Sequence, residues 1–306
     1  MARGSLASRD QDITFVAGDV RWQRELRRRQ SAWREAQGYP IGLHKGRPLG
    51  SRLAMPDAET NLWNFVTPGI RDLVRREYAA NQGAVTNRKL MQAPRLFDDL
   101  LSSQPLVFNL FGELTLDLDR ATVAARRLWP DRVDTVTGIE FEWSPGRGDA
   151  TYLNNGTAAD VAFFHTIPQG GRGLIFVETK YHEDLRVKNN AVNARHIDVA
   201  AMSRAFRPEA LPILRTGKLQ QLWFDHLLVH ATLQAHRLDG ALFVVVYPEI
   251  NERCRDAIAQ YRLTLEPSAA STFDSRTLEE VVPAVEEAVG GGWGAAFRGR
   301  YLTPTR

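Results

Sequence analysis

Cysteine is nearly absent from this sequence, because Cys254 is the only one among 306 residues. A single cysteine excludes an internal disulfide and any zinc site built from cysteines, and it fits a reducing compartment. Long hydrophobic runs are absent too: the longest, residues 241–247, has the length of a strand, whereas a membrane helix needs about 20 apolar residues. The polar residues 1–10 contain no apolar signal core. We therefore expect a cytoplasmic protein that does not enter a membrane.

Lysine is scarce as well, since only five of the 39 basic residues are lysines and the rest are arginines. The net charge of +3 is by itself a weak indication of a nucleic-acid partner. No phosphate-binding P-loop and no Gly-x-Ser-x-Gly motif is present, which argues against a nucleotide-hydrolysing motor and against serine hydrolases of that type. A lysine in an unusual position is therefore informative, and Lys180 is in one.

Helical spacing dominates the first hundred residues. Apolar residues at helical intervals predict helices over 20–35, 57–80 and 87–101, and a stretch rich in Gly, Pro and Arg predicts a loop or arm over 44–56. The first helix carries six arginines, either as a solvated face over a packed stripe or as a face that contacts phosphates. We expect residues 1–104 to form a mainly helical region that contacts DNA or a second subunit.

The pattern changes to a mixed α/β order in residues 105–306. Strands are predicted over 133–143, 159–165, 173–181 and 242–247, and helices over 117–128, 218–236, 252–262 and 277–289. A glycine-rich stretch over 290–294 predicts a short flexible hinge. Strands that follow one another directly and then continue through a helical crossover predict a mixed central sheet flanked by helices.

The strand predicted over 173–181 is apolar until it ends in Glu178 and Lys180. Side chains alternate between the faces of a strand, so these two project to the same side, roughly 6 to 7 Å apart along the chain. Burying a carboxylate and an ammonium at the end of such a strand costs desolvation energy unless a metal ion or a phosphate compensates. His182 and Glu183 follow directly, either to help position the pair or simply to begin the next loop.

A second carboxylate, Asp160, begins the preceding strand, and the turn around residues 169–173 folds the chain back. In an antiparallel hairpin Asp160 would lie close to Glu178. Two carboxylates at one edge of a sheet can hold Mg²⁺, which prefers oxygen ligands and retains several waters. The strand before offers Glu140 or Glu142 as a third carboxylate, and we favour Glu142 because it stands at the strand end. Phosphodiester hydrolysis uses such parts, with Lys180 orienting or deprotonating the attacking water, or neutralising charge in the transition state.

The arrangement of Asp160, a hairpin and then Glu178-Thr-Lys180 resembles the split Asp and Glu-x-Lys motif of the PD-(D/E)XK nuclease superfamily. Residues 105–250 are similar to a branch of restriction endonucleases, and the likeness is carried by Asn109 to Gly112, Glu142 to Arg147, Tyr152 to Thr157, Asp160 and Glu178 to Glu183. The proline that usually precedes the aspartate is Ala159 in this chain.

This resemblance implies a restriction-endonuclease-like α/β core with Asp160, Glu178 and Glu142 as metal ligands and Lys180 as the catalytic lysine. It also implies a polar residue near the site on the helix that follows, at Gln221, and Mg²⁺ as the cofactor, with Mn²⁺ able to substitute. A homodimer is implied as well, because cutting both strands requires two sites.

The sequence thus predicts a metal-dependent DNA endonuclease that serves restriction or another defence system, with a methyltransferase or other defence protein as a possible partner. Two alternatives remain open at this point: a nuclease fold kept as a non-catalytic DNA-binding subunit, and a nuclease acting on RNA or branched DNA.

Overall fold

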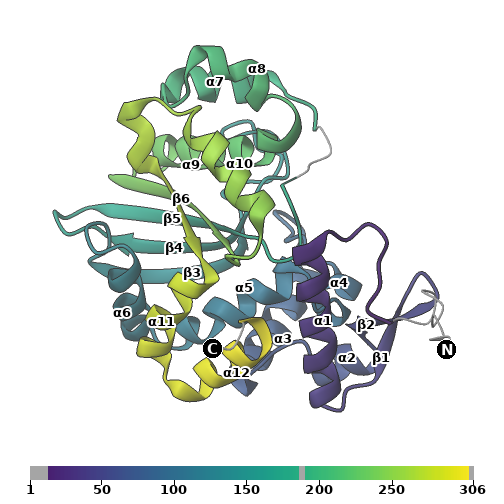
Figure 1. Ribbon diagram of the computed structural model, residues 1–306. Helices are drawn as coiled ribbons and strands as arrows, with labels where there is room; N and C mark the ends of the chain where they lie inside the picture. Colours follow the sequence, from purple (N-terminus) through teal and green to yellow (C-terminus); the bar gives the residue numbers. More distant parts are fainter. Residues whose placement is uncertain (1–12, 186–189, 303–306) are drawn as a thin grey trace.

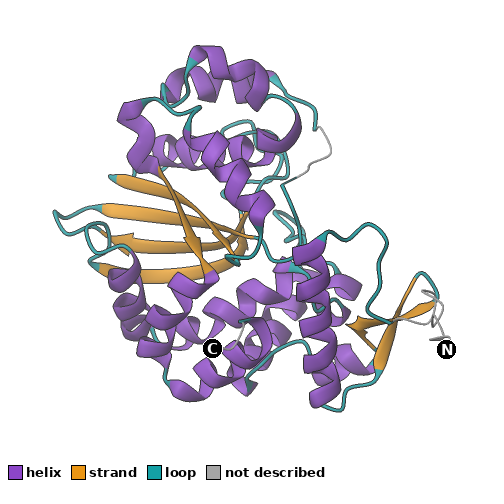
Figure 2. Cartoon of the chain, in the orientation of Figure 1, coloured by secondary structure: helices purple, strands orange, loops and turns teal. Residues whose placement is uncertain are grey.

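A five-stranded mixed sheet forms the centre of the protein, which we describe from a computed structural model over residues 13–185 and 190–302. Its strands lie in chain order, and they are β3 (Thr135–Trp143), β4 (Ala159–Thr166), β5 (Arg172–Thr179), β6 (Gly240–Tyr247) and β7 (Phe273–Thr277). The first three strands pair antiparallel, and β5, β6 and β7 pair parallel. The expected mixed sheet with flanking helices is therefore confirmed (Figures 1 and 2).

Helices cover both faces of this sheet. The longer ones are α1 (Arg21–Ala36), α3 (Pro68–Gln82), α5 (Ser103–Phe111), α6 (Leu118–Leu128), α7 (Ala194–Ser203), α9 (Gln220–Ala235), α10 (Glu252–Arg262), α11 (Leu278–Val289) and α12 (Gly291–Tyr301). Short helices are α2 (Asp57–Asn61), α4 (Ala93–Asp98), α8 (Leu211–Leu214) and the 3-10 turns η2 (Gly112–Leu116), η3 (Pro208–Ala210), η4 (Gly217–Leu219) and η5 (Pro267–Thr272). None of the described helices combines the length and apolar composition needed to cross a bilayer.

Alternation along the strands divides the hydrophobic core into two layers. On one face, residues such as Val161 and Val177 pack with α5, α6 and α11. On the other face, Phe176 and Val245 pack with α7, α9 and α10. Because β5 and β6 are parallel, the chain between them crosses over one face of the sheet, and α7, α8 and α9 belong to this crossover (Figure 1). The crossover brings the start of α9 back to the end of β5, where the acidic residues stand.

The N-terminal region is mainly helical and packs on the same core. Trp22 and Leu26 of α1 belong to one continuous hydrophobic cluster with α5, the sheet, and Tyr301 and Leu302 at the end of α12. The first and last described helices thus lie side by side (Figure 1). The division of the chain at residue 104 stays a prediction.

One local expectation was wrong because turn chemistry outweighed composition. The stretch 44–56, expected as a loop, is largely a hairpin of β1 (Ile41–His44) and β2 (Arg47–Leu53). Its two-residue turn has positive φ at both Lys45 (51°) and Gly46 (78°), the conformation that matches the twist of paired strands.

Three further expectations were wrong in extent. The helix expected over 57–80 is broken after Leu62, which is left-handed at φ 52°, and restarts with Pro68 in its first turn. The helix expected over 87–101 shrinks to α4. The expected hinge at 290–294 is the start of α12, where the buried residues Trp293, Phe297 and Tyr301 recur every fourth position. Their packing overrides the low helix propensity of glycine.

Candidate active site

The strand register aligns three acidic residues across the sheet. Phe141 pairs with Val161, and Val161 pairs with Val177. The next position on each strand is Glu142, Asp160 and Glu178, so these carboxylates form a row across β3, β4 and β5. Glu140 lies two residues before Glu142 on β3, opposite Ala162, and is exposed. The register therefore brings Glu142, rather than Glu140, into line with Asp160 and Glu178.

Glu178 stands at the centre of a short polar chain. Its Oε1 accepts hydrogen bonds from Lys180 Nζ at 2.5 Å and from Gln221 Nε2 at 2.7 Å. Lys180 continues the β5 ladder, because its backbone N–H donates to the Val246 carbonyl. Gln221 lies in the first turn of α9. The structure thus brings Glu178, Lys180 and Gln221 together, and the side chains of Glu178 and Lys180 are more than nine-tenths buried.

Asp160 and Glu142 are held by different neighbours. Oδ2 of Asp160 accepts hydrogen bonds from the backbone N–H and the hydroxyl of Thr179, at 2.7 and 2.6 Å. Glu142 has a left-handed backbone, with φ 48°. Its carboxylate accepts from Gln104 Nε2 of α5 at 3.1 Å and pairs with Arg147 at 3.3 Å. Arg147 therefore contacts Glu142, and its side chain is only 10% exposed.

The acids repel one another electrostatically. Burial and the charges of Glu178 and Glu142 raise the pKa of Asp160 well above 3.8. Burial also raises the pKa of Glu142, against the hydrogen bond from Gln104 and the charge of Arg147. Lys180 shows the complementary effect: burial lowers its pKa, but the charges of Glu178 and Asp160 outweigh burial and raise it, so the side chain stays an ammonium at neutral pH. A concentration of negative charge that Lys180 only partly offsets favours a cation.

Residues 17–303, nearly the whole chain, match the sequence profile of the PD-(D/E)XK nuclease superfamily. The chain belongs to this superfamily. Membership implies a phosphodiester hydrolase, and nucleases of this superfamily typically use a divalent metal. No curated protein and no solved structure shows significant similarity to the chain.

The donor set of this PD-(D/E)XK protein fits a divalent metal. Within the described residues, Oδ1 of Asp160 and Oε2 of Glu178 receive no hydrogen bond, while the other oxygen of each carboxylate is held by the protein. The same residues contain no group of three His, Cys, Asp or Glu side chains close enough to hold an ion among them. Mg²⁺ needs no such cage, because it binds through one or two carboxylates and completes its shell with waters and substrate oxygens.

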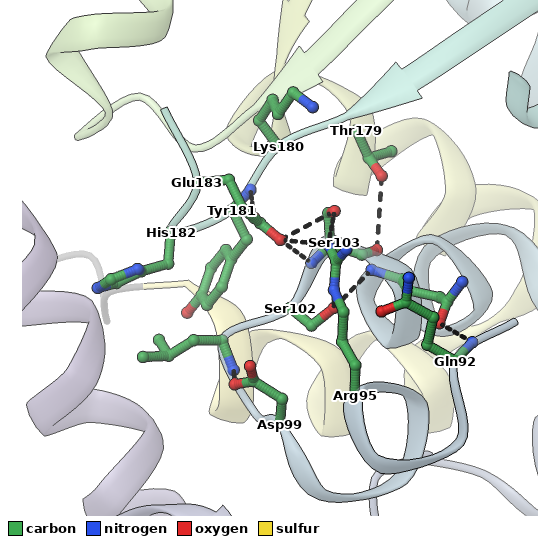
Figure 3. A network of polar contacts seen from close by, with 12 residues as sticks. Gln92, Arg95, Asp99, Ser102, Ser103, Thr179, Lys180, Tyr181, His182 and Glu183 are labelled. Atoms are coloured by element: carbon green, nitrogen blue, oxygen red, sulfur yellow. Dashed lines mark hydrogen bonds and ion pairs between the residues drawn. The ribbon is translucent and has the colours of Figure 1, made fainter. Parts of the chain in front are cut away.

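A second carboxylate network fixes the loop that follows Lys180 (Figure 3). Oε1 of Glu183 accepts from the backbone N–H of Ser103 at 2.9 Å and from Arg95 at 2.8 Å, and Oε2 accepts from the N–H of Tyr181 at 3.2 Å. Burial raises the pKa of Glu183, but the charges of Arg95 and Lys180 outweigh it, so the net shift is downward. Glu183 thus joins the end of β5 to the first turn of α5, where the helix dipole favours an anion.

Sequence reasoning did not identify Gln104 and Arg95 as neighbours of the site. Both lie about 40 or more residues before the acids that they contact. One signal was available, because Ser102 caps α5 by accepting from the Gln104 N–H, and a serine before an apolar run marks a helix start. That signal locates the helix without saying which acids face it.

Proposed function

We propose that this protein is a metal-dependent endonuclease that hydrolyses DNA phosphodiester bonds in the cytoplasm, as part of restriction or another defence system. The observation that carries the proposal is the row of Glu142, Asp160 and Glu178 beside the buried ammonium of Lys180, in a chain of the PD-(D/E)XK superfamily. Assignment to the restriction branch and to DNA rests on the resemblance of residues 105–250.

In this proposal Asp160 and Glu178 hold Mg²⁺ or Mn²⁺, with Glu142 as the auxiliary acid. The bound metal supplies a Lewis acid for the phosphoryl oxygens and a water of lowered pKa. Lys180, kept positive by Glu178 and Asp160, neutralises charge that develops on the phosphate in the transition state. Gln221 fixes the rotamer of Glu178 through its 2.7 Å hydrogen bond. Gln104 and Arg147 orient Glu142.

The test is cleavage of supercoiled plasmid DNA with Mg²⁺, with Mn²⁺ and with EDTA. Lys180→Met should lower the cleavage rate at least about 100-fold, the usual loss when one transition-state donor is removed. Lys218→Met is the matched control, because it removes a lysine from η4, outside the row, and should cleave as the wild type does. Glu142→Gln and Glu140→Gln form a second pair, in which only the former should lose activity. Cleavage that persists in EDTA or in Lys180→Met would refute the mechanism.

The substrate and the assembly are tested in the same preparation. Comparing duplex DNA, single-stranded DNA, junctions and duplex RNA separates the DNA proposal from cleavage of RNA or branched DNA. Metal-independent binding without cutting would instead favour a non-catalytic subunit. We also propose a homodimer, which predicts that both strands of a duplex are cut within one binding event and that the mass in solution is twice that of the chain. A methyltransferase or other defence protein remains the proposed partner.

A further inference from the structure

Helix α1 divides its six arginines into two groups. Three are used to hold the fold: Arg27 pairs with Asp19 at 2.6 Å and bonds Ser51, Arg34 bonds the Gly50 carbonyl, and Arg29 bonds the Tyr301 carbonyl. The other three, Arg21, Arg24 and Arg28, are exposed. The sequence alone could not separate these groups, since all six read as one basic helix.

The exposed arginines form a single stripe, which we call the α1 stripe (Arg21, Arg24 and Arg28). Their spacing of three and four residues places them in line along one helix face. Seven residues of helix rise about 10 Å. One strand of a nucleic acid carries a phosphate about every 3.4 Å of axis, so the stripe spans roughly three phosphates.

The arginines of the α1 stripe make no ion pair within the described part of the chain, although the exposed Glu25 lies four residues after Arg21 and three before Arg28. The first turn of α1 contains no acidic residue, although the positive end of a helix dipole favours one. The N-cap is Val20, whose side chain accepts no hydrogen bond. Arg21 and Arg24 therefore add positive charge where the helix already carries it, and an external anion would relieve this repulsion.

The α1 stripe lies next to the loop that follows the catalytic lysine. Gln23 Nε2 donates to the His182 carbonyl at 3.0 Å, and the rings of Trp22 and His182 are 6.1 Å apart. His182 is two residues beyond Lys180, on the opposite side of the loop from Thr179 (Figure 3). Arg24 follows Gln23 directly, so the stripe borders the surface that touches this loop.

We propose that the α1 stripe binds the phosphate backbone of the nucleic acid beside the bond that is cut. This inference rests on the proposed nuclease function and adds to it a binding surface outside the acid row. The stripe supplies affinity and no chemistry, because its three arginines lie outside the hydrogen bonds and ion pairs that Glu142, Asp160 and Glu178 make in the described part of the chain.

The test measures binding of a labelled DNA duplex of about 20 base pairs by fluorescence anisotropy over a range of salt concentrations. Cleavage is prevented with EDTA. The triple variant Arg21→Gln, Arg24→Gln and Arg28→Gln should bind about tenfold or more weakly at moderate salt. A plot of the logarithm of the binding constant against the logarithm of the salt concentration has a negative slope. In the triple variant the magnitude of this slope should be smaller by up to about 3, or about 0.9 for each phosphate that an arginine no longer neutralises. The same positions changed to lysine should keep the slope of the wild type.

A matched control removes three exposed arginines from α6: Arg120→Gln, Arg126→Gln and Arg127→Gln. It alters the net charge equally, and α6 lies across the molecule from α1 (Figure 1).

Unchanged binding by the α1 variant, or equal weakening by both triple variants, would overturn the inference. If the wild type cuts DNA while the α1 variant binds normally, the nuclease function stands and the α1 stripe fails. If the wild type binds DNA through the α1 stripe but cuts no substrate, the α1 stripe stands and the nuclease function fails. No binding of DNA or RNA by the wild type refutes both.

Discussion

Replacing Asp160 by asparagine should abolish cleavage and make the metal-free protein more stable. Burial and the charges of Glu178 and Glu142 raise the pKa of Asp160 well above 3.8, so its ionised form destabilises the fold at neutral pH. The asparagine oxygen can accept both Thr179 hydrogen bonds that Oδ2 accepts now. The substitution thus removes the charge and keeps the contacts.

The size of this effect follows from linkage. For each unit by which the pKa of Asp160 in the folded protein exceeds its pKa in the unfolded chain, the free energy of unfolding is about 1.4 kcal/mol lower at a pH above both pKa values. Single stabilising substitutions commonly gain about 0.5 to 2 kcal/mol, and we expect the upper part of that range. For a chain of this size 1 kcal/mol corresponds to roughly 2 °C in Tm. Because the folded pKa is raised, the gain should be largest at high pH and vanish below about pH 4, where Asp160 is protonated in both states.

Thermal unfolding in EDTA at several pH values measures how much Asp160→Asn stabilises the metal-free protein. A titration with Mg²⁺ or Mn²⁺ measures how much bound metal stabilises the wild type. Metal at about 100 times its Kd should stabilise the wild type by about 2.7 kcal/mol and leave Asp160→Asn unchanged. Asp256→Asn serves as a control, because this carboxylate is 69% exposed. An Asp160→Asn protein less stable than the wild type at pH 8 in EDTA would refute the argument that the row is electrostatically strained.

Two further predictions concern the scaffold around the site. Burial raises the pKa of Asp19, but hydrogen bonds from His182 and Arg27 outweigh burial and lower the pKa to about 2. The lowered pKa contributes about 2 kcal/mol of stability above pH 4, and this contribution is lost as the pH falls toward 2. Asp19→Asn should therefore flatten the acid-unfolding curve over that range. The fully buried Arg300 donates to Gln30 and Asn64, so Arg300→Met should destabilise by about 3 kcal/mol or more in denaturant titrations, whereas loss of the exposed Arg298 pair should cost less than about 1 kcal/mol.

Much of the fold was predictable because its signals are local. The period of apolar residues located α1, α6, α9, α10 and α11 to within a few residues, and apolar runs of strand length located β3 to β6. The helices α7 and α8 of the crossover and the strand β7 were not predicted. Their burial comes from residues distant in sequence, and Phe273 of β7, for example, pairs with Phe243 of β6.

Part of the candidate site was likewise predictable from local sequence, and part was not. Strand geometry alone places Glu178 and Lys180 on the same side of a strand end. In the structure Lys180 Nζ lies 2.5 Å from Glu178 Oε1. The choice between Glu140 and Glu142 required the register of β3 against β4, which local sequence does not specify. The contact of Gln221 with Glu178 depends on where the crossover returns.

The sequence by itself therefore determined the motif, the order of the strands that carry it and the presence of a basic helix, because each depends on neighbours within a few residues. Only the tertiary structure decided which acid completes the row, which helix start meets Glu183, and which arginines of α1 are left exposed. Those outcomes depend on contacts between segments far apart in the chain, and burial and charge at such contacts are set by the packing of the whole molecule.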